Sequence, residues 1–318
     1  MNIGFFSNQL GDRGTEVAMF DYAYYNQTIL NNKSYIFYPK NGNNNNDVIQ
    51  KFNDKFLTFA LDNFEQVDEE IIKHNIKILY IIKFGNNDNK LSKIAKNICH
   101  CVFVCNEPHG DVYCSISSWV SRNTNVPVLP HIVHLPDCNE NMREELNIPN
   151  DAIVFGRHGG YGQFDIDYVH QVIYDVAFNN PNIYFLFVNT KPFCSKLPNI
   201  IHIDCIIDLL QKRKFINTCD GMIWGRSDGE TFGLSIAEFS FCNKPVIATN
   251  FNFCNKDIAH YYLLQDKGLW YNSPDELKNL LLNFNNYNVV NKDWNAYKKF
   301  SPENVMKIFK QICIDPLI

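Results

Sequence analysis

The chain has 318 residues, of which 46% are hydrophobic, 14% aromatic and 20% charged, and its formal net charge is −5 at pH 7. This composition is typical of a folded protein and excludes an intrinsically disordered chain. The net negative charge argues against a protein that coats nucleic acid, although local basic residues could still bind a small anion. Because no window approaches about 18 consecutive apolar residues, we expect no transmembrane span.

The start of the chain and its cysteines both indicate a cytoplasmic protein. The first seven residues, MNIGFFS, include no basic residue, whereas a secretory signal peptide begins with a basic region. The 11 cysteines are odd in number and scattered along the chain, which favours reduced thiols over a disulfide framework. We therefore expect a cytoplasmic location.

In the first part of the chain, short apolar runs alternate with amphipathic stretches. We expect strands at residues 2–6, 33–38, 56–60, 77–82 and 100–105. We expect helices at residues 15–29, 47–53, 65–74 and 91–97. Such alternation of strands and helices predicts a parallel sheet that is covered by helices on both faces.

A second series of the same kind follows a stretch that contains several prolines, residues 126–149. Its expected strands are 152–156, 183–188, 200–203, 221–224 and 245–249, and its expected helices are 165–178, 208–217 and 233–241. Residues 274–312 read as mostly helical. We predict an α/β protein with Rossmann-like, doubly wound domains at 1–135 and 136–290, followed by a helical tail at 291–318 for which a return to the first domain is one possible arrangement. Ligands of such sheets bind at the carboxyl ends of the strands, here in a cleft between the domains.

The most informative stretch lies at residues 225–238, which read GRSDGETFGLSIAE. Gly233 and Leu234 would present free amides at the start of the helix expected there, where an anion can bind. Glu230 precedes that helix, and Glu238 lies about one and a half turns inside it. Both carboxylates could therefore point toward one extended ligand. Judged on spacing alone, the favoured interpretation is a turn carboxylate at Glu230 and a solvent-facing helix residue at Glu238.

This segment resembles the signature of family 4 retaining glycosyltransferases, which have the GT-B fold. That signature has two glutamates, Phe-Gly-Leu after the first of them, and Pro-Val-Ile after a short loop. Here Glu230, residues 232–234, Glu238 and residues 245–247 fall in register with it. The resemblance implies that Glu230 contacts the donor sugar near the reacting carbon and that Glu238 binds ribose hydroxyls. It also implies that the amides of Gly233 and Leu234 hold the diphosphate.

Residues 155–165, FGRHGGYGQFD, resemble a Gly-Arg motif of the same family. The resemblance implies that Arg157 neutralises the donor diphosphate, and a guanidinium suits this role because it can bind phosphate oxygens through two N–H groups. The alternative is an exposed loop arginine. The family usually has a lysine about five residues later, where this chain has Gly162 or Gln163. Arg226 or Lys191 could supply the missing positive charge.

Two loops of the first domain also resemble family motifs. Residues 11–16, GDRGTE, resemble the glycine-rich loop before the first helix, which implies that Gly14 approaches the donor phosphates and the acceptor. Residues 106–111, NEPHGD, follow an expected strand. Family members place a donor-contacting histidine in this domain, so His109 is the candidate, with His100 as the alternative and Glu107 as a neighbour. A lone histidine is more often structural.

Two patterns could indicate metal ions, and in both cases we favour another interpretation. Asp165 and Asp167 have Asp-x-Asp spacing but stand at an expected helix start, where carboxylates cap free amides. Cys99 and Cys101 alternate along an expected strand, and the Cys and His residues between 99 and 114 do not have the paired spacing of zinc sites. We predict no metal site and no bound cofactor.

The resemblance implies a metal-independent, retaining transfer of a sugar from a UDP- or GDP-sugar to a hydroxyl of a glycan or similar acceptor. Two alternatives remain open, namely a non-catalytic protein that binds nucleotide sugars, suggested by the missing lysine, and a GT-B epimerase that acts on the nucleotide sugar itself. A GT-B phosphorylase fits less well, because this chain is short and shows no pyridoxal-binding pattern. The base, the sugar, the acceptor and the oligomeric state are not determined by the sequence.

Overall fold

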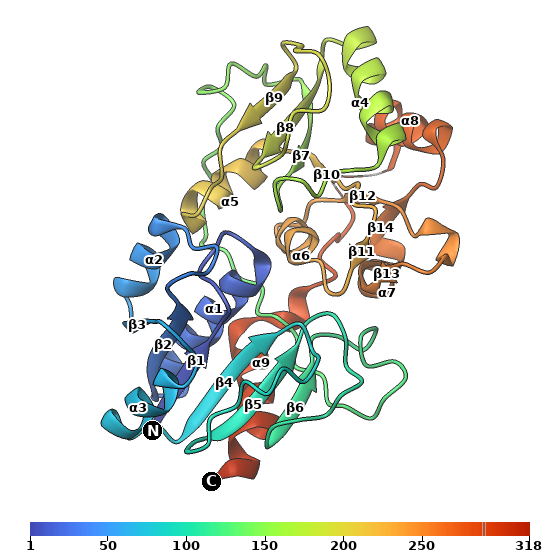
Figure 1. Cartoon of the computed structure of the whole chain (residues 1–318). Coiled ribbons are helices and arrows are strands. Elements are labelled where there is room, and N and C mark those ends of the chain that lie inside the picture. The colour runs from blue at the N-terminus through green and yellow to red at the C-terminus, as the bar shows by residue number, and fades with distance from the viewer. Residues whose placement is uncertain (288, 290) are drawn as a thin grey trace. The chain divides into compact units, whose positions relative to one another are not determined.

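The computed structural model describes residues 1–287, 289 and 291–318. The chain divides into two compact units, of which the first comprises Met1–Ile132 and Phe300–Ile318 and the second comprises Val133–Lys299. Each unit is built on a six-stranded sheet with helices beside it (Figure 1).

The first unit contains a fully parallel sheet with the strand order β3-β2-β1-β4-β5-β6. Its strands are β1 (Asn2–Phe6), β2 (Lys33–Pro39), β3 (Leu57–Leu61), β4 (Ile78–Lys83), β5 (Lys96–Cys101) and β6 (Val112–Ser115). Its helices are α1 (Gly14–Thr28), α2 (Asn46–Asn53), α3 (Gln66–Lys73) and α9 (Pro302–Phe309). The central strands are continuous apolar runs because helices cover both faces of the sheet.

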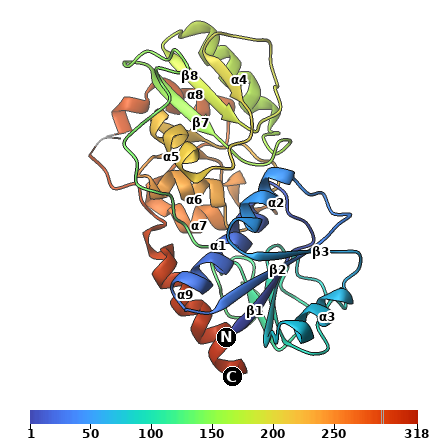
Figure 2. The ribbon, with the colours of Figure 1, turned by 90° about the vertical axis from the view of Figure 1, so that its left-hand side faces the viewer.

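Two cores cover the faces of this first sheet. On one face Phe37 of β2 and Leu79 of β4 are fully buried in a cluster that includes Val67 of α3. On the other face the ring of Tyr22 in α1 lies 5.3 Å from the ring of Phe309 in α9. Helices α1 and α9 contact each other (Figure 2). Helix α9 therefore helps to build the core of the first unit, although it lies near the end of the chain.

The second unit contains another fully parallel sheet, with the strand order β14-β12-β10-β7-β8-β9. Its strands are β7 (Ile153–Arg157), β8 (Ile183–Val188), β9 (Ile200–Ile203), β10 (Gly221–Ile223), β12 (Val246–Ala248) and β14 (Gly268–Trp270). A separate parallel pair is formed by β11 (Gly229–Glu230) and β13 (Asp257–Ile258). The helices are α4 (Asp167–Asn179), α5 (Leu209–Thr218), α6 (Leu234–Phe241), α7 (Ala259–Leu264) and α8 (Pro274–Leu282).

Helices α4 and α8 pack against each other beside β7 and β8 (Figure 2). Their apolar faces belong to a core cluster that includes Phe155, Phe185 and Phe284. Short 3-10 turns lie at Phe251–Phe253, Gln265–Lys267, Phe284–Tyr287, Lys298–Phe300 and Asp315–Leu317, and a π-helical turn lies at Lys310–Ile314. The predicted fold class, two Rossmann-like parallel sheets, is therefore confirmed.

Side-chain caps explain where several of these helices begin. The Ser273 hydroxyl accepts a hydrogen bond from the amide of Glu276, and Pro274 occupies the first turn of α8. Ser301 and Pro302 repeat this arrangement at α9. Such a cap satisfies an amide that has no partner inside the helix, and proline costs nothing there because its missing N–H would be unpaired anyway.

The helix predicted at residues 91–97 is wrong, and the strand predicted at 100–105 begins earlier, as β5. Polar side chains explain the error, because they bind the backbone that a helix would need. The side chain of Asn97 accepts a hydrogen bond from the amide of Ser92 at 2.8 Å and donates one to the carbonyl of Ser92 at 2.9 Å. The Ser92 hydroxyl in turn accepts the amide of Ala95 at 2.9 Å, so the segment folds into a compact turn.

Both sheets follow one topological scheme, since each starts in the middle, grows outward on one side, and then continues on the other. The direction changes between β1 and β4 in the first unit, and between β7 and β10 in the second. Loops leave the carboxyl ends of such neighbouring strands in opposite directions, and the opening between them is where open α/β sheets bind ligands. These two points are therefore the first places to look for a site.

Candidate functional site

At the switch point of the second unit, β7 ends at Arg157 and β10 ends at Ile223. The two strands are hydrogen-bonded neighbours, so the loops that follow them begin side by side. Residues 158–166 form the loop after β7, and residues 224–233 form the connection from β10 to α6, which includes β11. Most of the residues singled out in the sequence lie in these two segments or directly beside them.

Arg157 is only 4% exposed, and its guanidinium is held by three acceptors. It donates to the carbonyl of Asn189 at 3.2 Å, to the hydroxyl of Thr190 at 2.6 Å, and to the carbonyl of Gly160 at 3.0 Å. Burial lowers the pKa of Arg157 to about 10, while the charge of Glu230 opposes this effect. The guanidinium is thus protonated at neutral pH and fixed in place, as an electrostatic site for a bound anion requires.

Glu230 lies at the end of β11 and belongs to the same group of charges as Arg157. Its carboxylate accepts a hydrogen bond from the indole of Trp224 at 3.0 Å, and a guanidinium nitrogen of Arg226 lies 3.5 Å away. Burial raises the pKa of Glu230, and the nearby Arg226 and the Trp224 hydrogen bond lower it in part. A carboxylate in this setting is oriented by its partners instead of rotating freely in water.

Glu238 lies in α6, is only 3% exposed, and takes part in a buried triad with Lys212 and His158. The Lys212 ammonium lies 2.9 Å from one carboxylate oxygen, and Nε2 of His158 lies 2.9 Å from the other. Burial opposes ionisation, but Lys212 and then His158 lower the pKa of Glu238 to about 2. Burial also lowers the pKa of His158, so at neutral pH the imidazole is uncharged and Lys212 carries the balancing charge.

Gly233 and Leu234 lie at the start of α6, where the sequence predicts an anion site. Gly233 precedes the helix with φ of 79°, in the left-handed region that favours glycine. A Cβ at this position would also crowd the Ile236 side chain at 3.3 Å. Leu234 begins the helix, and the first amides of a helix have no partner within it. The roles predicted for Gly233, Leu234 and Glu238 in donor binding remain predictions.

The two residues considered for the missing positive charge lie in different surroundings. Arg226 is mostly buried, approaches Glu230, and influences the pKa of Arg157. Lys191 is exposed, and its amide donates to the carbonyl of Tyr161 at 2.9 Å. Lys191 directly follows Thr190, which holds Arg157, so it stands at the rim of the same group of residues.

The helix-capping role predicted for the Asp165 and Asp167 pair is wrong for Asp165. Helix α4 begins at Asp167, and its N-cap, Ile166, makes no side-chain cap. The Asp165 carboxylate instead accepts the amide and the hydroxyl of Ser227, at 2.7 and 2.6 Å. The Asp165 carboxylate therefore links the loop after β7 to the loop after β10, because its two oxygens accept hydrogen bonds from both donors of Ser227 across the switch point.

Gly14 begins α1 in the first unit, after the loop that follows β1. The neighbouring Glu16 is 1% exposed and accepts hydrogen bonds from the side chains of Ser7 and Gln9 at 3.2 Å each and of Thr15 at 2.6 Å. Burial raises the pKa of Glu16, and these donors lower it in part. This carboxylate fixes the glycine-rich loop, and sequence reasoning did not assign it that role.

The two histidines proposed for the first unit differ in their surroundings. His100 lies in β5, is fully buried, and contacts the Tyr80 hydroxyl through Nδ1 at 2.5 Å. Burial lowers the pKa of His100 to about 3, so it is a neutral core residue. His109 lies in the loop between β5 and β6, and its Nδ1 is 2.6 Å from the carbonyl of Glu107. The predicted catalytic role of His109 remains a prediction.

The structure adds three residues to the site that sequence reasoning missed: His158, Lys212 and Trp224. His158 directly follows Arg157, and Trp224 ends a predicted strand, so position alone could have drawn attention to both. Lys212 gives no such signal, since it lies 26 residues before Glu238 on another helix. Among residues 1–287, 289 and 291–318, no group of three or more His, Cys, Asp or Glu side chains is arranged to hold a metal ion.

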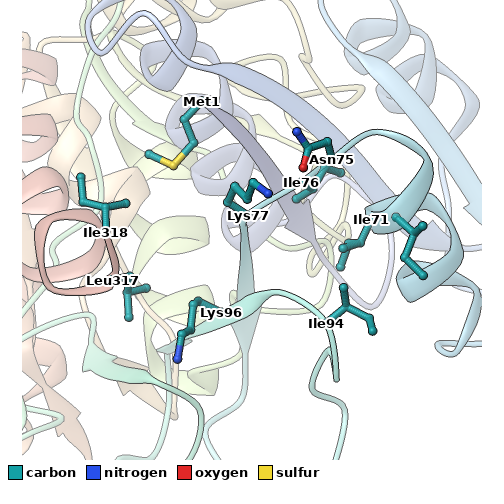
Figure 3. A pocket seen from close by; sticks show the side chains of 10 residues that line it. Met1, Ile71, Asn75, Ile76, Lys77, Ile94, Lys96, Leu317 and Ile318 are labelled. Carbon is teal, nitrogen blue, oxygen red and sulfur yellow. The ribbon is translucent and has the colours of Figure 1, made fainter.

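A pocket on the first unit is lined by other residues (Figure 3). It is lined by Met1, Lys77 and Lys96 together with isoleucine side chains. Met1 and Lys77 precede β1 and β4, and Lys96 is the first residue of β5, so the pocket lies at the amino edge of the sheet. Ligands of parallel α/β sheets bind at the opposite edge. In the part of the chain that the structure describes, no helix has both the length and the apolar character to cross a membrane.

Comparison with known proteins identifies the fold. No protein-family model matches the sequence, and the search of curated proteins gives no match. HepE of Anabaena, solved in complex with UDP-glucose, is similar over 98% of each chain, with a TM-score of 0.71 and 12% identity. A glycosyltransferase from Rickettsia africae is similar over 99% of each chain, with a TM-score of 0.68 and 15% identity.

The same fold is shared with a Listeria monocytogenes protein assigned as a UDP-N-acetylglucosamine 2-epimerase. It covers 98% of this chain and 96% of its own, with a TM-score of 0.62 and 9% identity. Similarities at such low identity establish the fold alone. The chain therefore has the GT-B fold that the sequence motifs predicted, and its chemistry must be argued from its own residues.

Proposed function

We propose that this protein is a metal-independent, retaining glycosyltransferase that moves a sugar from a UDP- or GDP-sugar to a hydroxyl of a glycan or a similar acceptor. One observation carries the proposal. The switch point of the second GT-B sheet holds a buried, protonated Arg157 in the same charge cluster as the carboxylate of Glu230, beside the start of α6. This arrangement suits a ligand with an anionic diphosphate and a sugar attached to it.

The leaving group of such a transfer is a nucleoside diphosphate, which gains negative charge as its bond to the sugar breaks. Arg157 would stabilise that charge, together with the free amides at Gly233 and Leu234. Arg226 or Lys191 would supply the second positive charge. Because the guanidinium of Arg157 is already fixed by three hydrogen bonds in the protein, it would need little rearrangement during the reaction, which is the main requirement for electrostatic catalysis. No divalent ion is needed in this scheme.

The two glutamates would have separate roles. Glu230, held by Trp224 and Arg226, would orient the donor sugar beside the reacting carbon. Glu238 would serve the nucleotide side of the site, where Lys212 and His158 hold its carboxylate ionised. The departing phosphate would help to remove the proton from the acceptor hydroxyl, so neither glutamate is assigned as a covalent nucleophile.

The first unit would contribute acceptor binding and two donor contacts, from Gly14 in the loop after β1 and from His109 in the loop after β5. We propose a division of the chain into an acceptor domain at 1–135, a donor domain at 136–290 and a tail at 291–318. The cytoplasm is the proposed location. Its reducing conditions fit the 11 cysteines of the sequence, all of which are free in the structure.

An epimerase that acts on the nucleotide sugar is the alternative, and the Listeria protein of the same fold favours it. A non-catalytic nucleotide-sugar binder is a second alternative, because the lysine expected near residue 162 is absent. The three functions differ in their products. A transferase releases the nucleoside diphosphate, an epimerase returns an altered nucleotide sugar, and a binder returns the donor unchanged.

The test incubates the protein with UDP-glucose, UDP-N-acetylglucosamine and GDP-mannose, without acceptor, and follows the products by NMR. We expect slow release of the nucleoside diphosphate from one donor, reduced about 100- to 1,000-fold in Arg157→Ala, as for the loss of one preorganised donor in a catalytic site. Arg157→Lys, which keeps the charge, should retain more activity. Arg122→Ala is the matched control, since Arg122 is exposed, its guanidinium lies over the Trp119 ring, and it donates to the Trp119 carbonyl in the first unit. An epimerised sugar, or an unchanged donor at full occupancy, would contradict the proposal.

A further inference from the structure

Two phenylalanines form an exposed stacked pair at the carboxyl edge of the first sheet. Phe84 directly follows β4, and Phe103 lies two residues beyond the end of β5. Their ring centroids are 5.1 Å apart with an interplanar angle of 25°. Phe84 is 57% exposed and Phe103 is 40% exposed. Single exposed apolar residues are common, but two stacked rings cover each other's inner faces and leave outer faces and edges as an apolar surface that water solvates poorly.

The backbone holds this pair in a fixed position. The amides of Phe103 and Val104 both donate to the carbonyl of Phe84, at 3.0 and 3.1 Å. Gly85 lies between the two loops with φ of 137°, and a Cβ there would come within 1.9 Å of the Val104 carbonyl oxygen. The Tyr113 hydroxyl donates to the carbonyl of Gly85 at 2.9 Å. The two rings are therefore presented by a rigid base, and a ligand would lose little free energy in ordering them.

The residues that adjoin the pair in the two loops are polar and carry no net excess of positive charge. Glu107 accepts the side chain of Asn86 at 3.1 Å and the amide of Asn87 at 2.8 Å. The charge of Lys83 is matched by Asp88, which forms an ion pair with it. All of these side chains except that of Lys83 are exposed. The rim thus offers amide donors and carboxylate acceptors, which suit hydroxyl groups better than they suit an anion.

The position of the pair in the fold also indicates a ligand. β4 is one of the two strands at the switch point of the first sheet, where the loops after β1 and β4 diverge. Phe84 begins the loop after β4, and the hydrogen bonds to its carbonyl bring the loop after β5 to the same place. Binding residues of open α/β sheets come from these loops.

We propose that Phe84 and Phe103 form a platform that binds a sugar ring of the acceptor, with Asn86 and Glu107 at its edge contacting the hydroxyls. A pyranose has an apolar face of C–H bonds, which stacks on the negative face of an aromatic ring, and a rim of hydroxyls. Both features match this surface. The proposal rests on the proposed function, and it narrows the acceptor to an uncharged carbohydrate.

The test is saturation-transfer NMR on the full chain with methyl glycosides of glucose, galactose, mannose and N-acetylglucosamine. We expect at least one glycoside to receive saturation through the C–H groups of one face of its ring. The double variant Phe84→Ala/Phe103→Ala should weaken this binding at least about tenfold, as loss of a buried aromatic contact does. Phe84→Trp should retain it. Phe178→Ala, which removes an exposed phenylalanine on α4 of the second unit, is the matched control.

Three results would overturn the platform. The first is that no glycoside binds the wild-type chain, and the second is that the double variant binds it unchanged. The third is that the double variant alters only the sedimentation coefficient, which would make the pair a contact surface for protein. UDP binding to the same samples separates this test from the proposed function. If UDP fails to bind while glycosides do, the donor assignment fails and the platform stands.

Discussion

The carboxyl edges of the two sheets have the same topology but opposite chemistry. In the second unit, the edge is built from buried charges, with Arg157, Glu230 and Glu238 each held by specific partners. In the first unit, the corresponding edge presents the exposed rings of Phe84 and Phe103. The shared strand order places the loops at the edge where open α/β sheets bind ligands. Under the two proposals above, the loops of the second unit would select a charged diphosphate and those of the first unit an uncharged sugar.

The difference also concerns stability. Burying charges is costly unless they are paired, so the edge of the second unit depends on the integrity of its ion pairs. The edge of the first unit depends on backbone geometry, above all at Gly85, where two loops approach closely. Substitutions that disturb one type of edge should therefore leave the other intact.

The largest effect is expected from Lys212→Met. This change leaves the buried carboxylate of Glu238 without its cation, and breaking a buried pair in this way costs about 3 to 5 kcal/mol of the free energy of unfolding. Urea denaturation of the full chain measures this loss of stability. Removing both charges, in Lys212→Met/Glu238→Gln, should recover part of the loss.

The matched control for that variant is Lys310→Met, which breaks an exposed ion pair with Asp315 in the first unit. Exposed pairs contribute about 0 to 1 kcal/mol, so this control should be nearly neutral. A loss below about 1 kcal/mol in Lys212→Met would mean that water or a movement of α5 compensates the charge, and the description of a rigid, buried site would be wrong.

A second prediction concerns pH. The pKa of Glu238 is lowered from the ordinary value of 4.5 to about 2, so its ionised form is favoured by folding. The contribution of the ionised Glu238 to the free energy of unfolding is fully present above pH 4.5 and is lost as the pH falls toward 2. Its size is about 3 kcal/mol, and about 2 kcal/mol should be lost by pH 3.

The measurement is the difference in unfolding free energy between wild type and Glu238→Gln, followed from pH 6 to pH 3. Glutamine cannot titrate, so the other carboxylates cancel in the difference. We expect the gap between the two proteins to shrink as the pH falls. A gap that does not depend on pH would show that Glu238 titrates as an ordinary carboxylate and is not held by Lys212.

The smallest effect is expected in the first unit, from Gly85→Ala. A Cβ at this position meets the Val104 carbonyl at 1.9 Å, and φ of 137° is unfavourable for alanine, so the two loops must separate. We expect a loss of about 1 to 3 kcal/mol in thermal or urea unfolding. Glycoside binding should weaken in the same variant, while UDP binding should not change.

Gly162→Ala is the control for this substitution, because among the described residues no heavy atom beyond those of Gly162 and its two chain neighbours lies within 4 Å of the added Cβ. It should change stability by no more than about 0.5 kcal/mol. If Gly85→Ala behaves like Gly162→Ala, the loops after β4 and β5 adapt easily, and the rigidity assumed for the platform is wrong.

Much of this fold could be predicted from the sequence because the buried strands of parallel sheets are short apolar runs. The runs at β1, β8 and β9 were predicted with the bounds that the structure shows. The error at residues 91–97 arose where side chains, not periodicity, decide the backbone path, since Ser92 and Asn97 hydrogen-bond to the chain around them. β6 and β14 were missed because they are short and offer too few residues for a pattern.

The site shows the same limit. Local motifs after predicted strands indicated four candidate residues, namely Arg157, Glu230, Gly233 and Glu238. Lys212 could not be found, since its pairing with Glu238 joins two helices 26 residues apart. The bond from Asp165 to Ser227 spans 62 residues, so spacing within the Asp-x-Asp segment could not reveal it. Contacts between loops depend on the tertiary fold, which local patterns do not specify.

Isothermal titration calorimetry of UDP and GDP tests most directly whether Arg157 binds a nucleoside diphosphate, with the wild type, Arg157→Ala and the platform variant Phe84→Ala/Phe103→Ala as samples. We expect one nucleoside diphosphate to bind the wild type and the platform variant alike, and Arg157→Ala to weaken this binding at least about tenfold, as loss of a charge-assisted hydrogen bond would. Binding of neither nucleotide to the wild type, or equal binding to the wild type and Arg157→Ala, would contradict this expectation.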